Sequence, residues 1–390
     1  MNMNVEEVLA KLVSFPVLGG QSNLSILNWI KTYVESHGVE THLVPNQEGN
    51  KASLHCRIGP AVDGGVILSG HMDVVPVEGQ EWSTDPFTLT DKGDENLYGR
   101  GSCDMKGFIA CCLAVLPQMI QADLKKPIYF AFSYDEEVGC LAGPDLAKAI
   151  KEDYQETPKY AIIGEPSMME PIIGQKGIYI METYVNGSAG HSSRIKQEVS
   201  AIHEAMRLIL WLEKKMDTLV QQGEKDERFH PPHSTIHIGI VNGGIAPNVI
   251  ADKAHFFWDL RTIPKDSMED IVAEFEAYCR EREKELRKIY PDFKIENVEN
   301  HPSVPHLDTQ IDDEVVDLIK KISGNSNWST VSYAAEAGQF ANEGFQSAIC
   351  GPGSIAQAHR ANEFVAKDQL EKGVKMLLNL TEELSTEEFL

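Results

Sequence analysis

The sequence has no hydrophobic run long enough to cross a membrane. Its longest nearly unbroken apolar stretch covers residues 108–116, whereas a spanning helix needs roughly 20 apolar residues. The N-terminus lacks a basic start followed by an apolar block, so we expect no export signal. Basic residues are few beside acidic ones, 35 against 59, and the net charge of −24 argues against nucleic acid and anionic membranes as partners.

Cysteine and nucleotide-binding motifs are also sparse. The seven cysteines are odd in number and form no C-x-x-C pair, a pattern typical of buried thiols in a reducing cytoplasm, where we expect the protein to be. Neither G-x-x-x-x-G-K-[ST] nor a strand-linked G-x-G-x-x-G occurs, which argues against a nucleotide-binding protein.

The length of 390 residues predicts two domains. In the first part, apolar runs at 65–70, 127–133 and 160–164 predict strands that are buried on both faces. Helical segments separate these strands, notably 106–119, and Ser22 is expected to cap an earlier helix. This alternation of strands and helices predicts an α/β layer structure with a mostly parallel sheet.

The pattern changes near residue 178. Strands are predicted at 178–187, 234–241, 253–261 and 293–298, with helices at about 198–215 and 267–285. The order β-α-β-β-α-β is that of a two-layer, ferredoxin-like α+β unit. We therefore expect an inserted domain at 178–294, and a main domain built from 1–177 and 295–390.

Six residues of the kinds that bind metals each stand beside a turn signal. Two imidazoles and four carboxylates exceed what one ion needs, but suit two ions that share a bridging carboxylate, with one carboxylate left as a base. That inventory indicates hydrolysis of an amide by an activated water. The residues are His71 in GHMD, Asp104 in GSCDMKG, Glu136 and Glu137 in YDEEVG, Glu165 in IIGEP, and His359 in IAQAHR.

The positions of these residues strengthen the interpretation. His71, Glu136–Glu137 and Glu165 each follow a predicted buried strand, and ligands of open α/β sheets gather at the carboxyl ends of strands. Any one of them alone is more often a solvated loop residue, so only the joint pattern of all six indicates a metal site. Glu136 and Glu137 face different directions in extended chain, so one can bind a metal while the other moves a proton; spacing does not decide which.

Further candidates surround this set. Asp73 is two residues after His71, on the same side of an extended stretch, where its carboxylate can accept the second ring N–H of the histidine. In the inserted domain, His191 in GSAGHSSR can donate to a developing oxyanion. Arg261 and the nearby Asn248 can hold a substrate carboxylate. Each of these is otherwise an ordinary turn or loop residue.

Taken together, the motifs resemble the dimetal amidohydrolase and exopeptidase family from end to end. The shared stretches are EWSTDPFTLT, DMKGF, YAIIGEP, GHSS, YAAEAGQF and GPGSIAQAH. The resemblance implies a catalytic three-layer α/β/α domain with an inserted lid that forms a homodimer. It assigns one metal to His71 and Glu165, the other to Glu137 and His359, and the bridge to Asp104. It makes Glu136 the general base, supports Asp73 and His191 in their roles, and implies a cis Asp104–Met105 peptide bond.

The same resemblance implies a substrate and a cofactor. The expected reaction is hydrolysis of N2-acetyl-L-ornithine to acetate and L-ornithine, a step of arginine biosynthesis, with two Zn²⁺ ions that Co²⁺ can replace. Arg261 and Asn248 would bind the α-carboxylate, Glu336 is our hypothesis for the δ-ammonium, and Gly353 is a further substrate-binding residue. The alternative is a related deacylase or dipeptidase, such as a succinyl-diaminopimelate desuccinylase. A non-catalytic binding protein is disfavoured because Glu136 and all five expected ligands are present.

Overall fold

The computed structural model describes residues 3–387 and 389, and the chain divides into two compact units. Unit 1 contains Met1–Gly174, Leu307–Thr330 and Ala335–Leu390, and unit 2 contains Gln175–His306 and Val331–Ala334. Unit 2 is therefore longer than the expected insertion of 178–294. The expected boundary between residues 294 and 295 cuts through the strand Lys294–Glu299, which pairs with the strand Gly177–Asn186 of unit 2. The local sequence pattern does not show which strand pairs with which.

The main sheet has four parallel strands at its centre. The order in the described residues is β1-β2-β6-β3-β7-β17-β8-β15, with β16 paired to β8. The pairs β6–β3, β3–β7 and β7–β17 are parallel, whereas β1–β2 and β2–β6 are antiparallel. The three predicted buried strands are confirmed as β3, β6 and β7. The strands are β1 (Thr41–Pro45), β2 (Ala52–Ile58), β3 (Val66–His71), β6 (Ile128–Ser133), β7 (Tyr160–Ile163), β8 (Ile172–Gln175), β15 (Leu307–Asp308), β16 (Ser329–Val331) and β17 (Gln346–Ile349).

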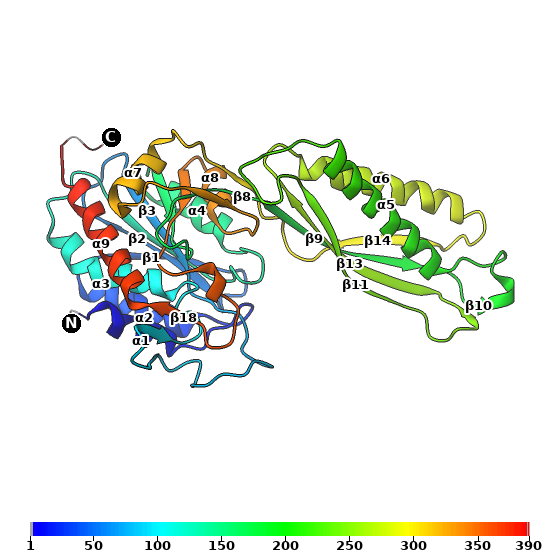
Figure 1. Ribbon diagram of the computed structural model, residues 1–390, viewed down its shortest axis with the longest axis horizontal. Coiled ribbons are helices and arrows are strands. Elements are labelled where there is room, and N and C mark those ends of the chain that lie inside the picture. Colours follow the sequence, from blue (N-terminus) through cyan, green and yellow to red (C-terminus); the bar gives the residue numbers. More distant parts are fainter. Residues whose placement is uncertain (1–2, 388, 390) are drawn as a thin grey trace. The chain divides into compact units, whose positions relative to one another are not determined.

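Helices cover both faces of this sheet, which confirms the predicted three layers (Figure 1). Alternate strand residues such as Val66 and Leu68 are packed into one core with five helices, because successive side chains of a strand point to opposite faces. These helices are α1 (Val5–Val13), α2 (Leu24–Ser36), α3 (Lys106–Gln121), α7 (Glu314–Ser323) and α9 (Lys367–Glu383). The other face carries α4 (Gly143–Asp153) and α8 (Ala337–Asn342).

The expected cap of α2 is wrong by one residue. The N-cap position belongs to Asn23, and the Ser22 hydroxyl donates instead to the backbone carbonyl of Asn50. The Asn23 side chain does not cap the helix, because it makes two hydrogen bonds with the backbone of Ala52 on β2. A long-range partner has therefore replaced the local one.

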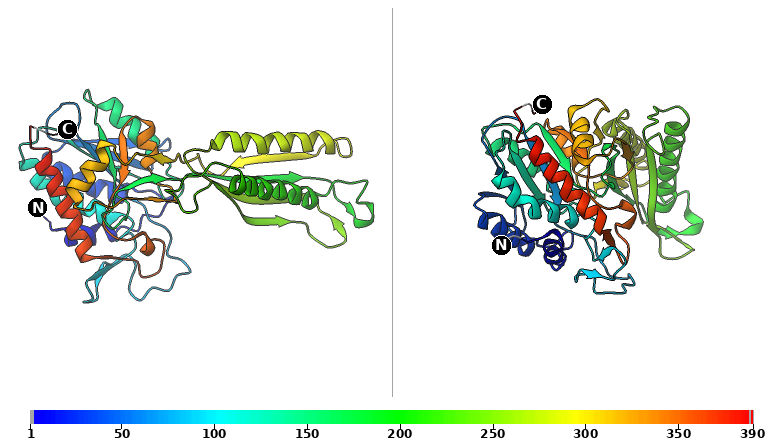
Figure 2. Two further views of the ribbon diagram at one scale, coloured as in Figure 1. Left: turned by 45° about the horizontal axis from the view of Figure 1, so that its top comes forward. Right: turned by 60° about the vertical axis from the view of Figure 1, so that its left-hand side comes forward.

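Unit 2 is a second two-layer structure. Its sheet has the order β11-β13-β9-β14 with every neighbouring pair antiparallel, the ferredoxin-like arrangement. Both helices pack on one face of that sheet around Phe256, Trp258 and Phe275 (Figures 1 and 2). The elements are β9 (Gly177–Asn186), α5 (Ala201–Gln221), β11 (Thr235–Gly243), β13 (Lys253–Thr262), α6 (Met268–Leu286) and β14 (Lys294–Glu299), with the short strands β10 (Gly190–His191) and β12 (Val249–Ile250).

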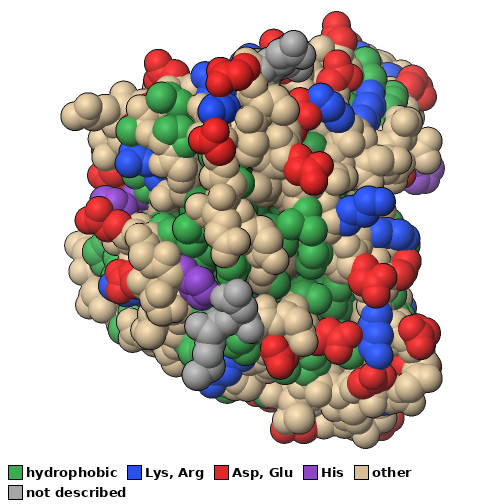
Figure 3. All heavy atoms as spheres, turned by 90° about the vertical axis from the view of Figure 1, so that its left-hand side faces the viewer, with side chains coloured by type: hydrophobic (Ala, Val, Ile, Leu, Met, Phe, Trp, Pro, Cys, Tyr) green, Lys and Arg blue, Asp and Glu red, His purple; other side chains and the backbone are tan. Residues whose placement is uncertain are grey.

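The helices and the cysteines both agree with what the sequence predicts. Within the described residues, no helix combines the length and apolar character of a membrane span. The seven cysteines are free and buried, as their spacing predicts. Figure 3 shows one face, on which acidic and basic side chains lie interspersed among hydrophobic and neutral ones.

Candidate active site

The site lies at the carboxyl ends of three adjacent parallel strands. His71 is the last residue of β3, Glu136 and Glu137 follow β6, and Glu165 follows β7. Because these strands are parallel neighbours, their ends share one edge of the sheet. Asp104 reaches the same edge from the turn before α3, and the Asp104–Met105 peptide bond is cis, as the resemblance implies.

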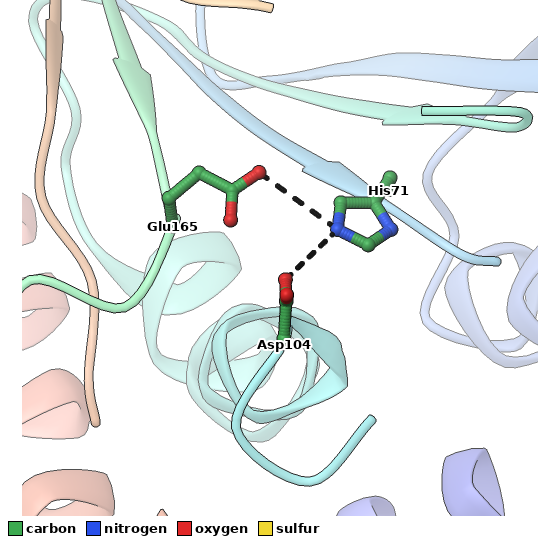
Figure 4. A group of neighbouring side chains, drawn as sticks. All are labelled: His71, Asp104 and Glu165. Carbon is green, nitrogen blue, oxygen red and sulfur yellow. Dashed lines mark hydrogen bonds and ion pairs between the residues drawn. The ribbon is translucent and has the colours of Figure 1, made fainter. Parts of the chain in front are cut away.

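One group that can hold a metal ion consists of His71, Asp104 and Glu165 (Figure 4). The His71 Nε2 atom lies 3.2 Å from Asp104 Oδ1 and 3.8 Å from Glu165 Oε1. All three side chains are buried. Figure 4 shows the two carboxylates directed at the same ring nitrogen from separate elements, as ligands around one ion are.

A second group contains Asp104, Glu137 and His359. The His359 Nε2 atom is 2.9 Å from Glu137 Oε2 and 3.5 Å from Asp104 Oδ2. Asp104 therefore presents Oδ1 to His71 and Oδ2 to His359. A carboxylate whose two oxygens face two separate ligand groups has the arrangement of a bridging ligand.

Glu136 belongs to neither group. Its Oε2 atom is 3.9 Å from His71 Nε2, and its Oε1 atom accepts a hydrogen bond of 3.4 Å from the Cys140 thiol. Glu137 points instead at His359. The structure thus separates the two adjacent glutamates, which spacing alone left undecided, and leaves Glu136 beside the ligands.

Asp73 supports the site differently from what its spacing suggests. The Nδ1 atom of His71 lies 2.9 Å from the backbone carbonyl of Asp73 and 3.6 Å from its carboxylate. The two carboxylate oxygens accept hydrogen bonds of 3.2 Å from the backbone N–H groups of Glu136 and Glu137. Asp73 therefore holds the His71 ring through its backbone and the glutamate turn through its side chain.

Electrostatics at this edge favour positive charge. Burial raises the pKa of Glu136, Glu137 and Glu165, and the neighbouring carboxylates add to the shift. Hydrogen bonds that the carboxylates of Asp104 and Glu137 accept from the His359 ring raise the pKa of His359 to about 10. Burial lowers the pKa of His71, but Asp104 and Asp73 more than reverse that shift.

The donor set fits divalent cations. Histidine nitrogens and carboxylate oxygens are the ligands that Zn²⁺ takes in catalytic sites. Within each group, the candidate ligand atoms all lie within 4.8 Å of one another, which suits atoms that surround one ion at about 2.0–2.2 Å. Two cations would also neutralise a cluster in which buried carboxylates outnumber imidazoles.

Two predicted substrate residues of unit 1 are largely enclosed by protein. Glu336 precedes α8 and is 1% exposed; its Oε2 atom accepts a hydrogen bond of 3.0 Å from Ser133, and its Oε1 atom has no partner in the described part of the chain. Burial raises its pKa to about 7. Gly353 has a φ of 93°, and its N–H donates to Gln369 Oε1 at 3.3 Å.

In unit 2, the predicted site residues lie at two separate positions: His191 and Asn248 at one, and Arg261 at the other. His191 on β10 is paired with Val249 on β12, next to Asn248. The Ser193 N–H donates to His191 Nδ1, so the neutral ring carries its proton on Nε2. Asn248 lies shortly before the start of β13, whereas Arg261 lies near the end of that strand, about 25 Å from its start by the rise per residue. The Nη1 atom of Arg261 donates to the Ser332 carbonyl at 3.0 Å.

Sequence reasoning missed two charged residues next to Asp104. Arg100 and Glu363 are each 1% exposed, and they form an ion pair of 2.8 Å. Charged side chains are rarely buried so completely without a role. Their closeness to GSCDMKG and to His359 is the signal that could have found them.

Comparison with known proteins places the chain in a family. The model of the peptidase family M20/M25/M40 matches residues 67–383. The chain belongs to this family. An M20 member is a hydrolytic enzyme, and the two metal-binding groups lie within the matched region.

Individual relatives agree with this assignment. The acetylornithine deacetylase of Pectobacterium carotovorum is 32% identical over 379 residues, which cover 94% of each chain. The M20 metallo-carboxypeptidase Sso-CP2 of Sulfolobus solfataricus has the same fold, with a TM-score of 0.77, 16% identity and coverage of 98% of this chain and 99% of that one. The YXEP protein of Bacillus subtilis, described as a dinuclear metal binding peptidase of the M20 family, has a TM-score of 0.61 at 15% identity, covering 97% and 96%.

Proposed function

We propose that this enzyme hydrolyses the N-acetyl amide of N2-acetyl-L-ornithine and releases acetate and L-ornithine. The proposal of a hydrolytic reaction is supported by the position of Asp104, whose two oxygens face His71 and His359. Glu136 belongs to neither ligand group and is therefore available to move a proton. The choice of substrate is supported by the similarity to the Pectobacterium acetylornithine deacetylase over nearly the whole chain. The buried free cysteines suit a reaction in a reducing cytoplasm.

We assign two Zn²⁺ ions to the site, with Co²⁺ as a possible substitute. His71 and Glu165 would hold one ion, Glu137 and His359 the other, and Asp104 both. When bound, such ions polarise an amide carbonyl and lower the pKa of a water towards neutrality.

The protein's own residues supply the proton transfer and the orientation. Glu136 lies 3.9 Å from His71 of the first group; in this proposal it takes the proton of the attacking water and then returns it to the departing amine. Burial raises the pKa of this carboxyl, which makes the protonated form easier to reach during the cycle. His191, protonated on Nε2, donates to the carbonyl oxygen as its charge grows.

Substrate recognition is assigned to charged groups. Arg261 is held by the Ser332 carbonyl, and its guanidinium binds the α-carboxylate. Asn248 of the same chain lies about 25 Å away along the strand, so we assign any help from Asn248 to the second copy of the chain. Gly353 remains a candidate at the GPGS turn. Glu336 is buried, so contact with the δ-ammonium requires the start of α8 to move, and this assignment has its own test. A Glu336→Gln enzyme that still prefers acetylornithine to acetyl-alanine contradicts it.

We further propose that unit 2 acts as a lid and joins two copies of the chain. Its edge strand β11 exposes Ile240 and Val241, and α5 exposes Met206 and Leu210. Exposed apolar side chains on a helix and on an unpaired strand edge are typical of an association surface. Leu210→Glu should then shift the chain from dimer to monomer in sedimentation experiments.

We also propose that His191 acts in the active site of the second copy, as the family resemblance implies, and a mixing experiment tests this. Glu136→Gln and His191→Ala chains are each expected to be nearly inactive. A mixed dimer contains one site with an intact Glu136 and an intact His191 from the other chain, so activity should return on mixing. If His191 acts within its own chain, mixing restores nothing.

The function itself is tested by a substrate panel with two matched variants. The wild type should contain two Zn²⁺ and release acetate from N2-acetyl-L-ornithine faster than from N-acetyl-L-alanine, while succinyl-diaminopimelate reports the alternative reaction. Glu136→Gln should keep both ions and lose about 10²–10⁴-fold in kcat. Glu137→Gln, the same change one residue away, should lose an ion. Two-ion binding without hydrolysis of any N-acyl amino acid would refute the proposal.

A further inference from the structure

A buried carboxylate lies directly behind the residue that both metal-binding groups share. Glu363 accepts four hydrogen bonds, two on each oxygen. Its Oε1 atom accepts from the backbone N–H groups of Cys103 at 2.9 Å and Asp104 at 3.0 Å. Its Oε2 atom accepts from the Gly101 N–H at 3.0 Å and from Arg100 Nη1 at 2.8 Å. All four donors belong to the turn 100–104, which carries Asp104 to the sheet edge.

The same ion pair also reaches the backbone of His359. Arg100 Nη2 donates to Gln80 Oε1 at 2.6 Å, and Gln80 Nε2 donates to the His359 carbonyl at 2.9 Å. Arg100 Nη1 donates to the carbonyl of Arg360 at 3.2 Å. The φ angle of His359 is 61°, a conformation that residues other than glycine adopt only when neighbouring contacts hold them in it.

These contacts are distributed unequally between the two metal-binding groups. His71 and Glu165 come directly from the ends of β3 and β7, so pairing within the sheet places them. His359 has no such support, because it lies in the segment between the short 3-10 helix Ile355–Gln357 and β18 (Phe364–Ala366). Its backbone depends on Gln80, and through Gln80 on Arg100 and Glu363.

We propose that Glu363, together with Arg100, is a positioning pair that holds Asp104 and His359 in place for the second metal ion. Glu363 fixes the turn of Asp104 through three backbone N–H groups. Arg100, which is paired with Glu363, holds the backbone of His359 through Gln80. Groups that orient metal ligands in this way commonly change metal affinity by about 10–100-fold when they are lost. The pair itself touches neither substrate nor ion. The inference rests on the proposed function only in that these ligands hold metal ions.

Stepwise zinc titration of the full-length apoenzyme against a competing chelator tests the pair. The wild type should bind two ions. Glu363→Gln keeps the shape of the side chain, but its amide nitrogen cannot accept the N–H groups that face it. We expect this variant to bind the second ion about 10–100-fold more weakly. The first ion should weaken by a smaller factor, because Asp104 serves both ions whereas His359 serves only the second. The matched control is Glu371→Gln, which removes one charge from the exposed surface of α9 and should bind both ions as the wild type does.

The titration separates this inference from its foundation and from a purely structural role. A wild type that binds no pair of ions refutes the proposed function. A Glu363→Gln protein that binds both ions as tightly as the wild type, or weakens both equally, refutes the positioning role. The visible absorption of Co²⁺ added as the second ion should also change in Glu363→Gln and not in Glu371→Gln.

A second variant keeps the inference testable if Glu363→Gln does not fold. Gln80 is only partly buried, and Gln80→Ala removes the link between Arg100 and His359 without leaving the Arg100–Glu363 ion pair broken. It should weaken the second ion selectively, and by less than Glu363→Gln. Unchanged affinity for the second ion in Gln80→Ala contradicts the proposed connection to His359.

Discussion

The contact between Gly164 and Phe108 offers a sharp test of how the sheet positions Glu165. Gly164 immediately precedes this ligand, and a Cβ atom added to it would lie 2.0 Å from Cγ and 2.1 Å from Cδ1 of the Phe108 ring. Carbon atoms normally pack at about 3.5–4.0 Å, so the overlap exceeds an ångström. Phe108 belongs to α3 and is enclosed in the core, so its ring cannot swing into solvent.

We therefore expect Gly164→Ala to destabilise the protein by about 3 kcal/mol, the upper end of the usual cost of overpacking. Phe108→Ala alone should cost about 4 kcal/mol, as a large buried aromatic does. The double variant should cost about 4 kcal/mol rather than the additive sum of about 7, because the smaller side chain removes the clash. Gly164→Ala should also weaken the first zinc ion, since any outward shift of Gly164 moves the Glu165 carboxylate.

Denaturant unfolding of the four proteins, followed by zinc titration, measures both effects. Gly239→Ala is the matched control, because a Cβ atom there comes no closer than 3.8 Å to the nearest side-chain atom. Additive losses in the double variant would show that Gly164 and Phe108 do not compete for the same space. Gly164→Ala with unchanged stability and unchanged zinc affinity would refute the reasoning altogether.

Three further predictions concern acid, metal and substrate. Burial first, and then the charge of His42, lowers the pKa of His55 to about 4, whereas histidine in an unfolded chain has a pKa of about 6.5. The stability that neutral His55 contributes is therefore fully present above pH 6.5. It falls by about 3 kcal/mol as the pH drops from 6.5 to 4, because the unfolded chain then binds a proton that the folded chain does not. Unfolding curves across this range should show a shallower loss for His55→Gln, and equal slopes contradict the assignment. Removal of metal by a chelator should lower the melting temperature, and two equivalents of Zn²⁺ should restore it, because ions that bind only the folded state stabilise it; identical melting with and without zinc excludes a metal at this site. Arg261→Lys should raise the KM for acetylornithine at least about tenfold with little change in kcat, because lysine cannot form the two-pronged contact with a carboxylate; a wild-type KM removes Arg261 from substrate binding.

Most of the architecture could be predicted because local patterns encode it. Continuous apolar runs identified β3, β6 and β7, since strands covered on both faces carry apolar side chains on both sides. Period-two alternation identified β9, β11 and β13, and the order of elements predicted the ferredoxin-like unit. The edge strand β1 and its neighbour β2 were not predicted, and β14 was divided by the expected domain boundary, because pairing partners and unit membership are properties of the folded chain.

The site residues likewise fall into those that the sequence predicts and those that only the folded chain identifies. A polar residue that follows a buried strand is visible in the sequence, so the sequence alone predicts that His71 and Glu165 lie at one edge of the sheet. The adjacent Glu136 and Glu137 are chemically identical, and only the folded chain separates their environments: Glu137 faces His359, whereas Glu136 lies by His71 and Cys140. Arg100 and Glu363 stand close to Asp104 and His359 in the sequence, which marks them as candidates, but only the folded chain shows that they form a buried ion pair.

The sequence by itself determined which residue types are available, in which order, and on which kinds of element they stand, because hydrophobic periodicity and turn residues act over a few neighbours. The tertiary structure decided which distant side chains meet: His359 with Glu137 across 222 residues, and Glu363 with the turn of Asp104 across 259. Such meetings depend on strand order and core packing, which are set by the free energy of the whole chain rather than by any short segment of it.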